Sequence, residues 1–248
     1  DDSSITLSLI NRVETEIRHI VAGQDLVILT SGNEWIISGS STITPSNVTT
    51  VCQAQRGSSK CPVQFIGNRI IHVLQRGSTV RDLGYDYSSD SYTGVDLTIL
   101  SKHLVRDATI TSATYNQEPD SVIYYVRDDG ELNCLTYVKE QDVYGWSHWI
   151  TDGTIEHVVS IPRSTKDILY AVVNRTINGV TVRYIERFLP LPDSETLTDY
   201  AMMDCYKTFT VTDKTFTYPA LSGKTVQVLV DGKRMPDVTL DSAGAGTT

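Results

Sequence analysis

Four β-hairpins recur along the chain at a nearly constant spacing, and this repeat constrains the fold more than any other feature of the sequence. Their turns fall near Gly32, Gly77, Asp129 and Ile177, so successive turns lie 45, 52 and 48 residues apart. Repeats of roughly 40–50 residues that contain several short strands are typical of β-propeller blades. The sequence therefore predicts an all-β, propeller-like chain in which one antiparallel unit recurs.

The two later repeats can be aligned beyond their hairpins. "TITSATYNQEPDSVIYYVRDDGELNCLTY" matches "TIEHVVSIPRSTKDILYAVVNRTINGVTVRYIE", since each has a strand, a polar link with proline, a second strand, a glycine-containing turn and a third strand. "YGWSHWIT" (144–151) supplies a fourth strand. We therefore expect residues 109–151 and 154–188 to form successive four-stranded antiparallel blades that pack face to face. Their hairpins should turn at Asp128–Gly130 and Thr176–Gly179.

Alternation along a strand assigns its side chains to the two faces of the sheet. Val122, Tyr124 and Val126 lie on one face, whereas Ile123 and Tyr125 lie on the other. Because both faces are apolar, we expect neighbouring sheets to cover both. The residues predicted to have a structural role are Trp146, Trp149, Tyr124, Val126 and Ile185 in the core, with Gly130 and Gly179 at turns that need a positive φ.

One segment, "SYTGVDLTILSKHLV" (91–105), is expected to contain a short helix. Leu97, Leu100 and Leu104 recur there at helical spacing, and Asp96 is placed to cap the start. We expect this helix to lie on the surface of a sheet, where it packs or contacts a neighbour.

The composition changes after Phe188. "LPLPDSETLTDY" contains prolines and acidic residues without periodicity, so we interpret residues 189–206 as a linker. It divides the propeller-like repeats (1–188) from a small β-module (207–248) with an Asp231-Gly232 hairpin turn. Roughly 40 residues bury little apolar surface, so this module either leans on the first domain or is the truncated start of a longer unit.

Charge and motifs argue against several classes of function. The chain has 30 Asp and Glu against 21 Lys and Arg, which gives a net charge of −9. Binding to nucleic-acid phosphates needs a basic surface, so the charge argues against a nucleic-acid-binding protein. The four cysteines lack zinc-site spacing and are expected to be free thiols. Glycoside hydrolysis needs two carboxylates that converge in a pocket, but Glu131, Glu140 and Glu156 lie in separate predicted strands and loops. The sequence also contains no G-x-S-x-G motif, no H-E-x-x-H motif and no phosphate-binding glycine loop. We therefore predict that the protein is not an enzyme and has no catalytic, cofactor-binding or metal-binding residue, hence no cofactor.

An aromatic cluster leaves a second function open. Tyr144, Trp146 and Trp149 lie close together in the sequence with His148, and flat aromatic rings can stack on sugar rings. Alternation places Trp146 and His148 on one face and Trp149 on the other, which favours burial between sheets. A module that binds host-surface glycans is therefore the alternative function.

Three long strings carry a resemblance to a known family: "SSDSYTGVDLTILSKHLV", "QEPDSVIYYVRDDGELNCLTYVKEQDVYGWSHWITDG" and "RTINGVTVRYIERF". The chain resembles phage and prophage virion structural proteins that are similar to the tail nozzle, or tubular B-type, proteins of short-tailed phages. "LSGKTVQVLVDGKRMPDV" is similar to the β-module that follows in the same proteins.

This resemblance implies a β-propeller-containing subunit of the virion, assembled in the bacterial cytoplasm. Copies of the subunit would form a ring, commonly a hexamer, at the end of a tail and would contact neighbouring tail or adaptor proteins. DNA would pass through transiently without tight binding, and no membrane insertion is expected. Family members are usually longer, with earlier blades, so about four repeats would give either a small closed ring or an open arc.

Overall fold

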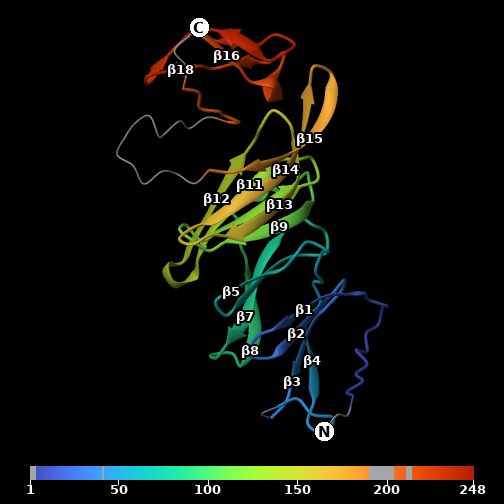
Figure 1. The fold of residues 1–248 in the computed structure, drawn as a ribbon. Helices are drawn as coiled ribbons and strands as arrows, with labels where there is room; N and C mark the ends of the chain where they lie inside the picture. The colour runs from blue at the N-terminus through green and yellow to red at the C-terminus, as the bar shows by residue number, and fades with distance from the viewer. Residues whose placement is uncertain (1–3, 41, 190–203, 211–213) are drawn as a thin grey trace.

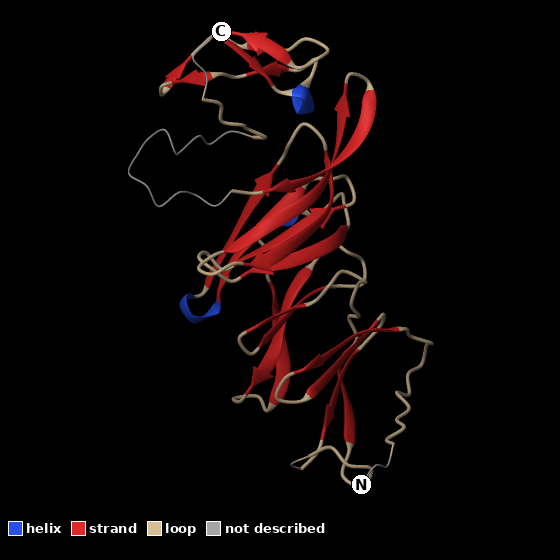
Figure 2. Ribbon diagram, in the orientation of Figure 1, coloured by secondary structure: helices blue, strands red, loops and turns tan. Residues whose placement is uncertain are grey.

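The computed structural model describes residues 4–40, 42–189, 204–210 and 214–248. Over these residues the fold is all-β: strands form nearly all of the regular structure, and the helical parts are three short 3-10 turns (Figure 2). The 3-10 turns are η1 (Lys102–Leu104), η2 (Lys139–Gln141) and η4 (Pro219–Leu221). No helix in these ranges is long and apolar enough to cross a membrane.

Residues 17–187 fold into four antiparallel sheets, and in each sheet the strands pair in the order in which they follow along the chain. The first sheet contains β1 (Ile17–Ala22), β2 (Leu26–Thr30), β3 (Glu34–Ser38) and β4 (Thr49–Ala54). The second contains β5 (Gln64–Ile66), β6 (Arg69–Val73), β7 (Val80–Asp86) and β8 (Ser91–Asp96). The third contains β9 (Ile110–Asn116), β10 (Val122–Arg127), β11 (Leu132–Val138) and β12 (Val143–Trp149). The fourth contains β13 (Thr154–Pro162), β14 (Asp167–Ile177) and β15 (Val180–Arg187).

The repeat found in the sequence is the repeat of these sheets. The four turns used to detect it connect the second strand to the third strand of each sheet: β2 to β3, β6 to β7, β10 to β11, and β14 to β15. The "YGWSHWIT" string contains β12, as expected. The fourth sheet departs from the expected four strands, because only three strands pair in its described part.

The sheets stack face to face in a row, and each junction has its own apolar core. Figure 1 shows the row running from the blue β1–β4 to the yellow and orange β13–β15, with these two sheets at opposite ends. The row is therefore open, one of the two arrangements expected for four repeats. The junction cores comprise Val27, Leu29, Ile36, Ile70 and Leu83 (first and second sheets); Ile71, Val73, Ile123, Tyr125 and Leu135 (second and third); and Val126, Leu132, Ile155, Leu169 and Val173 (third and fourth).

Strand β10 has the two-sided burial that its alternation predicts. Val122, Tyr124 and Val126 pack in the junction with the fourth sheet, whereas Ile123 and Tyr125 pack in the junction with the second. In such a stack neither face of an inner strand is exposed to solvent. The residues on both faces must therefore be apolar. The prediction for this strand is confirmed.

The prediction that Ile185 lies in the core is wrong. Its side chain is 80% exposed, on the face of the fourth sheet that points away from the third. Alternation correctly separates the two faces of β15, but it does not tell whether a neighbour covers the second face.

The expected helix over residues 91–105 is also wrong for most of its length. Ser91–Asp96 is strand β8, which pairs with β7, and the only helical part is the single turn η1. Thr93 and Val95 are β-branched and favour the strand. Asp96 accepts hydrogen bonds from the backbone N and Oγ1 of Thr98, at 2.8 and 2.5 Å, and so ends the strand in a turn.

The described part of the C-terminal module contains three pairs of short strands. They are β16 (Thr215–Thr217) with β21 (Ala245–Thr247), β17 (Thr225–Val226) with β20 (Val238–Thr239), and β18 (Leu229–Val230) with β19 (Lys233–Arg234). Asp231 and Gly232 connect the last pair with φ values of 47° and 78°, which confirms the predicted turn.

The module contacts the fourth sheet, which is one of the two arrangements expected for it. Lys224 Nζ lies 2.8 Å from Asp152 Oδ2, and Asn178 Nδ2 donates to the carbonyl oxygen of Ser242 at 3.2 Å. Most of the expected linker over 189–206 lies outside the described residues.

Candidate functional site

Two turn glycines make close contacts that join consecutive sheets. Gly77 and Gly130 are turn glycines with φ values of 80° and 87°. Each accepts a hydrogen bond at 2.9 Å from the first strand of the next sheet, from the backbone N of Ile110 and of Ile155 respectively. A Cβ at Gly130 would lie 2.5 Å from the Cβ of Thr154. Both positions therefore require glycine, for conformation and for space.

Gly179 has a different environment, although its sequence role looked the same. Its φ is 75°, as the turn requires, but no heavy atom of the described chain lies within 4 Å of a Cβ built on it. The prediction of a positive φ is confirmed at both Gly130 and Gly179. Only Gly130 lies in a junction between sheets.

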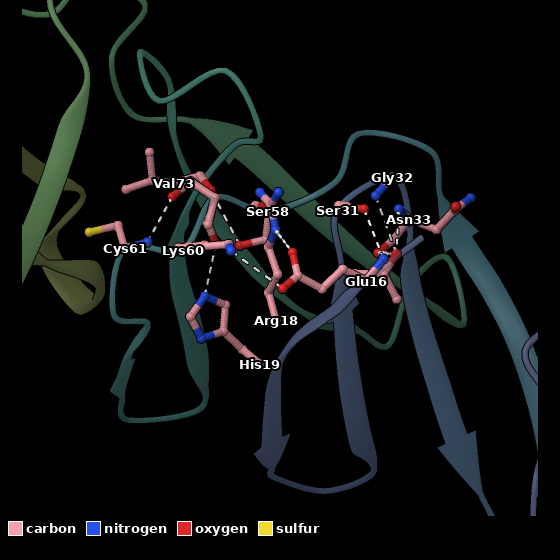
Figure 3. Close-up of polar contacts among 12 residues, drawn as sticks. Glu16, Arg18, His19, Ser31, Gly32, Asn33, Ser58, Lys60, Cys61 and Val73 are labelled. Carbon is pink, nitrogen blue, oxygen red and sulfur yellow. Dashed lines mark hydrogen bonds and ion pairs between the residues drawn. The ribbon is translucent and has the colours of Figure 1, made fainter. Parts of the chain in front are cut away.

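The junction between the first and second sheets is polar at its edge (Figure 3). Arg18 Nη1 donates to the carbonyl oxygen of Ser58 at 2.6 Å, and His19 Nε2 lies 2.9 Å from the carbonyl oxygen of Ser59. Glu16 forms ion pairs with two basic side chains, at 3.5 Å from Arg18 Nε and 3.4 Å from Lys60 Nζ. Side chains of β1 thus bind the backbone that leads into the second sheet.

A hydrogen bond to a buried ion pair of the second sheet joins this sheet to the third. Asp82 is fully buried; Arg69 Nε donates to its Oδ1 at 2.7 Å, and the Tyr137 hydroxyl donates to its Oδ2 at 2.8 Å. Burial, and the carboxylate beside it, raise the pKa of Tyr137 well above its usual range. The three groups satisfy one another, so a charge in the core is compensated and the two sheets are held in one register.

A second polar pair is buried between the first and second sheets. His72 Nε2 lies 3.8 Å from Glu34 Oε1, which is too far for a hydrogen bond. Burial and the nearby Arg81 lower the pKa of His72 to about 3, and burial raises the pKa of Glu34. His72 is therefore neutral at pH 7.

The two tryptophans of β12 lie in different junctions. Trp146 is half-buried, stacks on Tyr125 with ring centroids 5.6 Å apart, and donates from Nε1 to the carbonyl oxygen of Leu97 at 2.8 Å. Trp149 stacks on Phe188 at 5.5 Å and meets the edge of Tyr124 at 5.9 Å.

The predicted division of these rings between opposite faces is confirmed, and the structure does not bring them together as one platform. The prediction that Trp149 lies in the core is wrong, because the residue is 41% exposed. The nearby His148 lies 2.8 Å from Glu131 Oε2 through its Nε2.

The four cysteines are free thiols, as expected. Burial raises the pKa of Cys61 and of Cys134 to about 12, so both thiols are protonated at pH 7. Within the described ranges, no three His, Cys, Asp or Glu side chains are grouped as metal ligands.

No protein-family model matches the chain, and no curated protein matches it. The candidate functional surface is therefore defined by geometry alone. It consists of the junctions between sheets and of the two faces at the ends of the row. Sequence reasoning found the apolar parts of the junctions but missed the polar ones. No local pattern marks Asp82 and Tyr137 as partners, because they are 55 residues apart.

Proposed function

We propose that the chain is a structural, non-catalytic subunit of a phage tail, a nozzle-like component that forms part of the DNA exit channel. The observation that carries the proposal is the row of repeated sheets joined face to face by glycine contacts and buried polar pairs. Such a row suits the wall of a channel, since each repeat is stabilised by contacts with its neighbours. The resemblance of the long strings to virion proteins supplies the biological setting.

We further propose that the four sheets are blades of a propeller-like array. Each contributes a meander of antiparallel strands, and consecutive sheets bury facing apolar surfaces, as blades do. Copies of the chain would assemble into a ring with neighbouring tail or adaptor proteins. The ring would let DNA pass without holding it, because a chain with a net charge of −9 offers few phosphate contacts.

Binding of a host-surface glycan is the second candidate. The observation in its favour is Trp149, which is 41% exposed beside Tyr124 and Phe188. A glycan array separates the two functions. Loss of a specific glycan signal in Trp149→Ala, without a change in melting temperature, would establish the lectin; an array with no signal for the wild type would support the structural role.

Deletion of the gene in the phage or prophage tests the structural role. We expect DNA-filled heads that lack a complete tail, and mass spectrometry of wild-type particles should detect the chain. Normal tails after deletion, or particles that lack the chain, would overturn the proposal. Complementation with Leu100→Lys is the matched control, since Leu100 is 90% exposed and a structural subunit should tolerate its change.

A further inference from the structure

Strand β12 has an open edge in the middle of the row of sheets (Figure 1). The second and fourth sheets cover the two faces of the third sheet, but within the described ranges β12 pairs with β11 and with no other strand. The backbone N–H and C=O groups on the other side of β12 therefore lack a strand partner. Because the third sheet has a neighbour on either side, this edge does not depend on where the row begins or ends.

The sequence of β12 lacks the features by which natural proteins protect an open edge. Outer strands are usually short, charged or interrupted by a bulge, and each of these features discourages pairing with another chain. Strand β12 pairs with β11 over 7 consecutive residues without a bulge. The strand Val143–Trp149 contains no Lys, Arg, Asp or Glu. An edge of this kind can accept a further strand.

Every other outer strand in the described part of the four sheets has at least one of these features. Register shifts interrupt the pairing of β1, β4, β9 and β13, the short strand is β5 with 3 residues, and the charged strands are β8 with Asp96 and β15 with Arg183, Glu186 and Arg187. The unprotected edge is therefore specific to β12, in a chain whose net charge is −9.

Gly145 lies inside β12, although no contact within the described chain requires a glycine there. Its φ is not positive, and a Cβ built on it would lie near one heavy atom, the Cβ of Thr136 at 3.9 Å. Alanine would therefore fit, even though glycine weakens a strand. A glycine inside a strand often marks a bulge or a place where another backbone approaches closely. Since β12 has no bulge, the open space at Gly145 indicates an approaching partner.

A second copy of β12 supplies a side chain that fits this space. When two β12 strands pair in antiparallel fashion about a two-fold axis at Ser147, Gly145 of each copy lies opposite Trp149 of the other. Directly opposed residues share a face of the sheet, and an aromatic side chain opposite an edge glycine covers the exposed backbone. Trp149 is 41% exposed and therefore available for this contact. The same register places Trp146 opposite His148, so aromatic rings meet on the second face as well.

We propose that two copies of the chain associate edge to edge through antiparallel β12 strands, in the register centred on Ser147. The partner is a second copy because β12 is complementary to itself in this register. Two uncharged strands can also approach each other without the repulsion that acidic surfaces of the chain would cause. The contact uses the same strand of both copies, so it is isologous and complete with two copies. It cannot build a ring and is separate from the ring-forming contacts of the proposed function.

Charges introduced at Ser147 test this contact. Ser147 is exposed and would lie opposite itself, so Ser147→Lys and Ser147→Glu each place two like charges across the axis. An equimolar mixture of the two variants places opposite charges there. Leu100→Lys is the control, since Leu100 is 90% exposed in a loop outside β12. Sedimentation velocity over roughly 5–500 µM protein, at about 0.15 M salt, measures the association. Circular dichroism melting checks that each variant is folded.

We expect the wild type and Leu100→Lys to form dimers as their concentration rises, and each Ser147 variant to associate at least about fivefold more weakly, because like charges oppose each other. The mixture of Ser147→Lys and Ser147→Glu should recover the association as a heterodimer. A monomeric wild type would overturn the inference. So would single variants that associate as the wild type does, or a mixture that associates no better than either variant alone, because the contact would then lie elsewhere. Particle composition is independent of these results, so this contact and the virion role can fail separately.

Discussion

Gly130 lies directly against Thr154, the first residue of the next sheet. A Cβ at Gly130 would lie 2.5 Å from the Cβ of Thr154, and the carbonyl oxygen of Gly130 accepts a hydrogen bond from the backbone N of Ile155. Gly77 makes the same contact with Thr109 one repeat earlier. The turn within one sheet thus sets the distance between that sheet and the next one.

Alanine at Gly130 should destabilise the fold more than alanine at Gly179. Both glycines have a positive φ, which costs an alanine about 1–2 kcal/mol. Only Gly130→Ala also pushes two sheets apart, which adds roughly 1–3 kcal/mol. Urea unfolding of the two variants measures the difference, and equal losses would show that the contact with Thr154 contributes nothing.

Truncation of Trp146 should be costly and truncation of Ile185 should not. Trp146→Ala removes the stacking on Tyr125 and the hydrogen bond to Leu97, so we expect a loss of about 3–5 kcal/mol. Ile185→Ala changes an exposed side chain and should cost less than about 0.5 kcal/mol. Thermal or urea unfolding of the isolated chain checks both values. A large loss for Ile185→Ala would mean that its face is covered in the monomer.

Stability should fall as the pH decreases from 6.5 toward 3, because of His72. The unfolded chain protonates this side chain near its ordinary pKa of 6.5, whereas the folded protein keeps it neutral down to a pKa of about 3. The unfolded state therefore binds more protons in this window, and the free energy of unfolding decreases by up to ~1.4 kcal/mol per pH unit. Glu34 acts in the opposite direction, since its pKa is raised in the folded state.

His72→Gln isolates the contribution of the histidine. Between pH 6.5 and pH 5, the wild type should lose about 2 kcal/mol more than the variant. Denaturant unfolding at the two pH values measures this difference. Parallel pH profiles would contradict the burial of a neutral His72.

The isolated chain should show no measurable affinity for duplex DNA at about 150 mM salt. Its net charge of −9 opposes contact with phosphates, and a channel that releases DNA must not retain it. A gel-shift titration is the measurement. Submicromolar binding with a steep salt dependence would contradict this prediction.

The sequence predicts the parts of the fold that depend on local patterns. The Asp129 turn and the alternation over Val122 to Val126 were sufficient to place β10, β11 and their faces. The segment around Val95 was misassigned because leucines at helical spacing follow it directly, and the pairing of β8 with β7 depends on residues far away in the chain.

The environments that sequence could not predict are those created by stacking. Ile185 and Val126 both occur in alternating strands, but Val126 is covered by the fourth sheet and Ile185 is not. The partnership of Asp82 and Tyr137 likewise exists only because the second and third sheets meet. Such contacts depend on the order and number of sheets, which a local pattern does not specify.

Cryo-electron microscopy of the purified particles tests the central claim most directly. The account predicts a ring of copies around the DNA channel at the distal end of the tail, with the four sheets of each copy stacked face to face as in Figure 1. Particles with a complete tail in which no density fits this row of sheets, or in which the row lies on a host-binding fibre away from the channel, would contradict it.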